Sequence, residues 1–143
     1  MKINRIMCFL MVMCIFSFAS CSNTKDVTIL DRNSNKVVAE LSTKENTSEV
    51  AKLLDACNHA EKSNNAIHAK EEYLVHFIDP KDSQYDIWFD VYINERNDVY
   101  IQYDKEKMEN LNDFNKNNMN YDLMKCNNMT VSEFNEIITA AKK

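Results

Sequence analysis

The sequence predicts an α+β domain in which an antiparallel β-sheet of about five strands carries two helices packed on one face. Two observations lead to this prediction. Three runs rich in aromatic and β-branched residues, at 71–79, 85–94 and 99–105, are joined by turns too short for parallel crossovers. Helical periodicity appears before these runs and again at the C-terminal end. The expected order of elements is ββαβββα.

The domain is expected to begin with a hairpin. Residues 26–31 (DVTILD) and 36–41 (KVVAEL) have the composition of short strands, and the turn RNSN joins them. A helix should follow, because the segment that starts at Asn46 offers capping residues and then repeats apolar residues at helical spacing. The apolar side of this helix comprises Val50, Leu53, Leu54, Cys57 and Ala60.

The C-terminal part is less regular until its final helix. Residues 106–128 are polar, and a short strand around 121–125 is the candidate element within them. Thr130 and Glu133 then form the pattern of a capping box. The apolar stripe of the helix that follows comprises Val131, Phe134, Ile137, Ile138 and Ala141.

The first 20 residues have the pattern of a signal peptide. Lys2 and Arg5 give a basic start, and an apolar run follows from Ile6 to Ala19. A helix of about fourteen residues rises only about 21 Å, whereas a bilayer span needs about 20 residues. We therefore expect residues 1–20 to be removed rather than to persist as a membrane span.

The run Phe18-Ala19-Ser20-Cys21 resembles the bacterial lipobox, although Leu is usual at the position of Phe18. The resemblance implies that the Cys21 thiol receives a diacylglyceryl group and that cleavage occurs just before it. Acyl chains on one residue are enough for a stable membrane anchor. We expect residues 21–26 to form a lipidated tether, residues 27–143 to form one domain, and the protein to lie on the extracytoplasmic side of the cell membrane.

The composition excludes several classes of function. The chain has no glycine, so it cannot contain a phosphate-binding Gly-rich loop, a dinucleotide fingerprint or a nucleophile elbow. Asparagine occurs in nearly every expected turn and takes the positions that glycine often fills. Removal of Lys2 and Arg5 from the 17 basic residues leaves 15 against 22 acidic ones, a net charge of −7. That balance argues against nucleic acid as a partner.

The element order and the aromatic strand YDIWFDVYI resemble small YhfM-like lipoprotein domains of unknown function from low-GC Gram-positive bacteria. The resemblance covers about residues 27–141. It implies a small α+β lipoprotein and no particular activity.

Neither the candidate calcium loop nor the histidines predict a metal or cofactor. Residues 31–35 (DRNSN) match the start of a calcium-binding loop, but Lys36 and Ser42 stand where such a loop needs Gly and Glu. A hairpin turn is therefore favoured. The histidines lack metal-ligand spacing and a paired nucleophile. They are His59, His68 and His76.

The cysteines leave two alternatives open. Cys8 and Cys14 would leave with the signal peptide and Cys21 would be acylated, so Cys57 and Cys126 remain. Outside the cytoplasm these two could form a disulfide. The favoured alternative is a pair of free, buried thiols, because cysteine often serves as a small core residue.

Side-chain alternation predicts one face of the strands as a ligand surface. Turn lengths place His76 opposite Trp88 and Tyr92 opposite Tyr100. Aromatic rings mixed with carboxylates can stack against a ligand and accept hydrogen bonds or cations. The alternative to an exposed ligand surface is that segment 106–128 or the N-terminal hairpin covers this face. The candidate residues are His76, Asp86, Trp88, Asp90, Tyr92, Tyr100 and Asp104.

The sequence thus favours a noncatalytic, membrane-anchored binding or accessory module whose partner is a protein or a cell-envelope ligand. The alternative from another class is an immunity or inhibitory lipoprotein that protects the cell from a toxin or protease. A hydrolase is the third interpretation, because no Ser/His/Asp set or carboxylate pair stands out among the many acidic residues.

Overall fold

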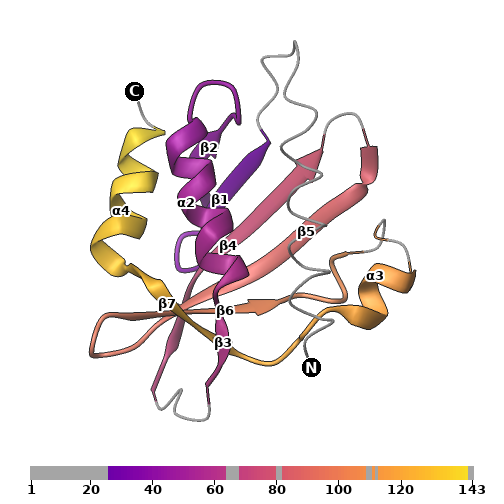
Figure 1. Cartoon of the computed structure of the whole chain (residues 1–143). Coiled ribbons are helices and arrows are strands. Elements are labelled where there is room, and N and C mark those ends of the chain that lie inside the picture. Colours follow the sequence, from indigo (N-terminus) through magenta and orange to yellow (C-terminus); the bar gives the residue numbers. More distant parts are fainter. Residues whose placement is uncertain (1–25, 64–67, 80–81, 109–110, 112, 142–143) are drawn as a thin grey trace.

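The computed structural model describes residues 26–63, 68–79, 82–108, 111 and 113–141. This part of the chain forms an antiparallel sheet of seven strands with three helices, in the strand order β2-β1-β4-β5-β6-β7-β3 (Figure 1). The predicted α+β class and antiparallel sheet are confirmed. The sheet has seven strands instead of about five, and α3 is a third helix beside the two that were predicted. The expected signal peptide and Cys21 lie outside the described residues.

The elements follow one another with short connections. None of the described helices is long and apolar enough to cross a membrane. The bounds are β1 Val27–Asp31, β2 Lys36–Leu41, α2 Thr47–Asn58, β3 Glu61–Lys62, β4 Lys70–Asp79, β5 Asp82–Ile93, β6 Asp98–Tyr103, α3 Asp113–Asn118, β7 Met124–Thr130 and α4 Val131–Ala140.

The extra elements are β3, α3 and β7, and β7 shows why the count was too low. Its sequence, MKCNNMT, has little β-propensity. It becomes a strand because it pairs with β6 and buries Met124, Cys126 and Met129 in the core. Tertiary pairing therefore overrides the local preference, and the strand runs to Thr130 instead of ending near residue 125.

Asparagine takes the backbone positions for which a glycine would be expected. Asn35 ends the β1–β2 turn with φ 53°, and Asn97 ends the β5–β6 turn with φ 60°. In the first turn, the Asp31 carboxylate accepts the backbone N–H of Ser34 at 2.7 Å. The segment 31–35 is thus a hairpin turn, as predicted, and its carboxylate is occupied by the turn itself.

The predicted register of the long strands is confirmed. His76 pairs with Trp88 and Phe77 with Ile87 across β4 and β5, and Tyr92 pairs with Tyr100 across β5 and β6. The hairpin between β4 and β5 is tighter than the expected turn at 80–84, because pairing extends to Asp79 and Asp82.

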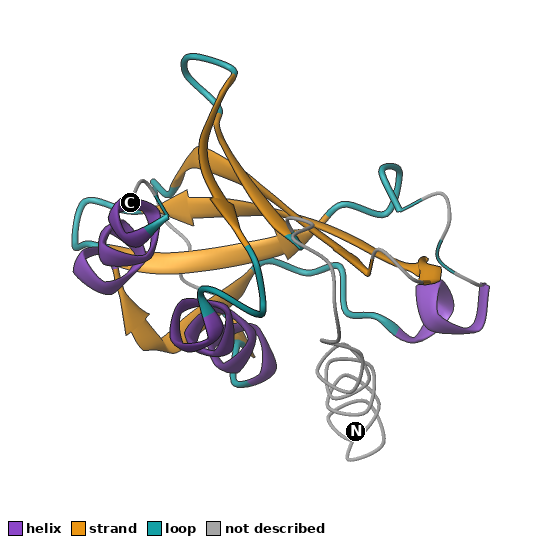
Figure 2. Ribbon diagram, turned by 90° about the horizontal axis from the view of Figure 1, so that it is seen from above, coloured by secondary structure: helices purple, strands orange, loops and turns teal. Residues whose placement is uncertain are grey.

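Helices α2 and α4 cover one face of the strongly twisted sheet, while α3 lies apart from them at the end of the sheet (Figure 2). The Tyr73 ring on β4 packs against Phe134 on α4, with ring centroids 5.2 Å apart. The predicted capping box is present, since Thr130 accepts the Glu133 N–H and the Glu133 carboxylate accepts the Thr130 N–H. Burial of a Phe or Leu side chain contributes about 1.5–3 kcal/mol. The largest buried side chains of this core include Ile29, Leu41, Val50, Val75, Phe89, Val91, Met108, Phe134 and Ile137.

Cys57 and Cys126, the cysteines of the described region, are not joined by a disulfide. Cys126 is 3% exposed on β7, and Cys57 is half-buried on α2. Burial raises the pKa of the Cys126 thiol to about 12. The favoured alternative of two thiols stays a prediction, and of the two side chains only that of Cys126 is buried as expected.

We predict that Cys126 resists alkylation in the native protein. With a pKa of about 12, only about one Cys126 thiol in ten thousand is ionised at pH 8, and the thiolate is the reactive form. Peptide mass spectrometry after alkylation without reductant should show modified Cys126 only when the protein is denatured. A disulfide-linked peptide containing Cys57 and Cys126 would contradict this state.

Candidate functional site

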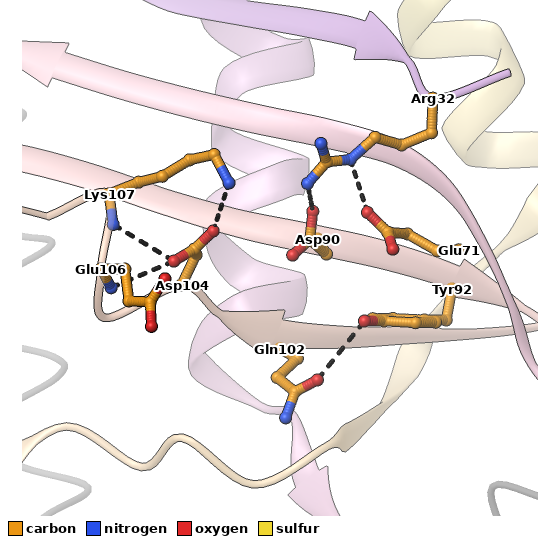
Figure 3. A network of polar contacts seen from close by, with 8 residues as sticks. All are labelled: Arg32, Glu71, Asp90, Tyr92, Gln102, Asp104, Glu106 and Lys107. Atoms are coloured by element: carbon orange, nitrogen blue, oxygen red, sulfur yellow. Dashed lines mark hydrogen bonds and ion pairs between the residues drawn. The ribbon is translucent and has the colours of Figure 1, made fainter.

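The face of β4, β5 and β6 that points away from α2 and α4 is the candidate site, and we call it the polar face. Because side chains alternate along a strand, the neighbours of the core residues Val75, Phe89 and Ile101 lie on it. Figure 3 shows part of it from close by, with side chains from three strands and two turns meeting above the sheet.

A histidine, a tryptophan and an aspartate form one end of the polar face. The His76 ring stacks on the Trp88 ring, with centroids 3.7 Å apart and planes 10° apart. Nε2 of His76 lies 2.5 Å from Oδ1 of Asp86. The carboxylate thus orients the imidazole, and the imidazole covers one side of the indole. Trp88 is half-buried, so part of its ring remains accessible.

An arginine joins two carboxylates in the middle of the polar face. Arg32 extends from the β1–β2 turn, with Nε 2.5 Å from Oε1 of Glu71, and one terminal nitrogen donates to Oδ1 of Asp90 (Figure 3). Partial burial and the nearby Asp90 carboxylate raise the pKa of Glu71. The positive guanidinium therefore offsets the negative charges of Glu71 and Asp90, which the sheet brings close together.

A bulge in β4 brings Glu71 to this face. Strict alternation would put Glu71 on the core side together with Tyr73. The register shifts between these two residues, so that Glu71 pairs with Tyr92 and Tyr73 pairs with Val91. Neither Glu71 nor Arg32 was among the predicted site residues. No signal in the sequence marks a bulge at this position, and Arg32 resembled an ordinary turn residue.

Tyr92, Gln102 and Asp104 complete the polar face on β5 and at the end of β6. The Tyr92 hydroxyl donates to the Gln102 side chain at 3.4 Å, and burial raises the pKa of Tyr92. The Asp104 carboxylate accepts a hydrogen bond from the Lys107 ammonium, with 2.5 Å between the nitrogen and the oxygen. Partial burial opposes ionisation of Asp104, but its hydrogen bonds from Lys107 lower its pKa overall.

The seven predicted residues differ in access. Asp86 is 8% exposed and Tyr100 is 2% exposed, so neither offers an open surface. The other five are half-buried. Arg32 reaches from the hairpin turn into the middle of this face, the turn at 104–107 borders it, and Gln102 donates to the Tyr121 carbonyl at 3.1 Å. Both segments considered as covers thus contact the polar face.

The described residues include no group of three or more His, Cys, Asp or Glu side chains placed to hold a metal ion. The ring of His76 hydrogen-bonds to Asp86 and stacks on Trp88, and the cross-strand neighbour of His76 on β1 is Thr28. Comparison of the chain with protein-family models, curated proteins and solved structures finds no match. A function must therefore be inferred from the polar face and the N-terminal sequence.

We predict that the emission of Trp88, the one tryptophan of the chain, depends on the His76 ring that stacks on it. Loss of that ring should uncover one side of the indole, so His76→Gln should shift the emission to longer wavelength and increase its quenching by acrylamide. His59→Gln, which alters an exposed histidine at the end of α2, should leave both properties unchanged. Equal emission and equal quenching in His76→Gln and the wild type would contradict the assignment.

Proposed function

We propose that this protein is a membrane-anchored lipoprotein of the extracytoplasmic side that acts as a noncatalytic binding or accessory module. Its partner is a protein or a cell-envelope ligand, bound at the polar face. The observation that carries the proposal is the half-exposed ring stack of His76 and Trp88 beside the charged cluster of Arg32, Glu71 and Asp90. A ring for stacking and fixed charges for orientation are what a recognition surface needs.

The contacts within the polar face support binding rather than bond making. The charged side chains of Arg32, Glu71 and Asp90 are fixed by partners on other strands or turns, so little ordering entropy is lost when a ligand docks. The hydrogen bond of His76 to Asp86 and its stacking on Trp88 fix the orientation of the imidazole as part of this surface.

The expected tether supports a position close to the bilayer. Asp26 is held at the sheet, because its backbone N–H donates to Leu41 and its carbonyl accepts from Ile78. Asp26 follows Cys21 by five residues, and at about 3.3 Å per residue this segment reaches roughly 17 Å. A partner of this protein would therefore be another molecule of the membrane surface or one that arrives there.

We predict that Cys21→Ala abolishes lipidation. Cells that express this variant should accumulate the larger precursor, and the protein should not incorporate labelled palmitate. Cys57→Ala serves as the control, because Cys57 lies on α2 within the folded domain. Normal labelling and maturation of Cys21→Ala would show that the lipobox interpretation is wrong.

We predict that the partner is lost when the polar face is altered. Intact cells that express a C-terminally tagged chain should give a discrete crosslinked species, and Trp88→Leu should remove most of it. Removal of a buried aromatic anchor from an interface commonly costs about 2 kcal/mol or more. Trp88→Leu should leave the fold intact, as judged by circular dichroism.

The matched control is Glu136→Gln, which alters an exposed residue on α4, on the opposite side of the sheet. This variant should crosslink as the wild type does. If Trp88→Leu and the wild type give the same species in the same amount, the partner does not bind at the polar face.

A further inference from the structure

A pocket of about 510 Å³ opens beside the turn between β5 and β6. Its walls include the turn residues Asn94 and Arg96, the β6 residues Asp98 and Tyr100, and Lys125 on β7. Asn94 follows Trp88 by six residues, about 20 Å along the strand direction, so the pocket is separate from the His76–Trp88 stack. Its volume falls in the usual range for small-molecule sites.

Both the oxygen and the nitrogen of the Asn94 side-chain amide form two hydrogen bonds, and these bonds fix the orientation of the amide. Its oxygen accepts the backbone N–H of Arg96 at 3.0 Å and of Asp98 at 2.9 Å. Its nitrogen donates to the Asp98 carboxylate at 3.0 Å and to the Tyr100 hydroxyl at 3.2 Å. Backbone N–H groups can only donate, so the amide oxygen must face them and the amide nitrogen must face Tyr100.

The Tyr100 hydroxyl is therefore an acceptor toward Asn94, and its own proton points elsewhere. No residue of the described chain accepts that proton, although Tyr100 is 2% exposed and lines the pocket. A buried donor without an acceptor is unfavourable by about 1–3 kcal/mol. An oxygen atom of a ligand in the pocket would satisfy it.

The charges around the pocket favour a negative ligand. The Asp98 carboxylate is already neutralised, because Lys125 donates to it at 2.9 Å and, together with Asn94, lowers its pKa. The Arg96 guanidinium is exposed and forms no ion pair with a described residue. Glu95, also exposed in the turn, is the remaining acid at the rim. Three groups of this wall offer donors to a ligand, namely the Tyr100 hydroxyl, the Arg96 guanidinium and the spare protons of Lys125. Ser63 and His68 line the pocket as well.

We propose that this pocket binds an oxyanion, a carboxylate or phosphate group carried by a small molecule. One oxygen of this group accepts a hydrogen bond from the Tyr100 hydroxyl, and the negative charge of the group pairs with the Arg96 guanidinium at the rim. This site goes beyond the proposed function, because it involves neither Trp88 nor the cluster around Arg32, and the two can be tested separately.

Nuclear magnetic resonance of the full-length chain in detergent, with ¹³C-labelled tyrosine rings, tests the proposal. Acetate and phosphate are added in separate titrations at constant ionic strength, with chloride as the balancing anion. The Tyr100 ring signal, assigned by its loss in Tyr100→Phe, should shift saturably with at least one of them, at about millimolar affinity. Saturation by acetate alone identifies a carboxylate, and saturation by phosphate alone identifies a phosphate group. No saturable shift with either overturns the proposal.

Variants then test the assigned contacts through the backbone amide signals of residues 95–98. Arg96→Gln and Tyr100→Phe should each weaken binding about tenfold, because each removes one charged or charge-assisted contact. Glu95→Gln should strengthen anion binding a few-fold, because it removes from the rim a negative charge that repels the anion. Arg96 and Glu95 are exposed, so their variants should fold normally. They test the anion site even if Tyr100→Phe is poorly folded.

Tyr92→Phe and Lys44→Gln are the matched controls. Tyr92 is the cross-strand neighbour of Tyr100, but its hydroxyl belongs to the contact with Gln102. Lys44 is an exposed cation near the start of α2. Both should bind the anion as the wild type does. Unchanged affinity in Arg96→Gln and Glu95→Gln, or equal loss in the controls, would overturn the assignment of the site.

Discussion

The pairing of β4 with β5 is the constraint on which the rest of the structure depends. These are the longest strands, and their register decides which side chains meet the helices and which form the polar face. A shift of β4 by one residue against β5 would turn Val75 and Phe77 outward and bury His76 in their place. Cross-strand stacking of Phe77 on Phe89 within the core, and of His76 on Trp88 outside it, both favour the observed register.

The parts of the fold that depend on periodicity could be predicted from the sequence. The hairpins around β1, β4, β5 and β6, the helices at both ends of the strand run and the pair of His76 with Trp88 all follow from apolar spacing and turn length. Strand β7 was predicted only in its first residues, as a candidate strand around 121–125, because the polar sequence that follows becomes extended only through its partner β6.

The candidate site was predictable where alternation along a strand places the side chain, and not where a bulge or a turn does. Trp88 and Tyr92 follow from alternation alone. Glu71 reaches the polar face through a bulge, and Arg32 arrives from a turn 58 residues before the carboxylate that it contacts. Burial of Tyr100 is a property of the folded arrangement. Contacts of this kind depend on the tertiary structure and leave no pattern in the local sequence.

The position of β1 has a mechanical consequence. This strand lies between β2 and β4, with hydrogen-bonded ladders on both sides, and it is the first strand of the described chain. A force transmitted along the backbone into Val27 would therefore load both ladders in shear, so that many hydrogen bonds must break together. A terminal strand on a sheet edge would instead peel away one bond at a time. The domain thus presents its most resistant attachment to whatever pulls on the chain before residue 26.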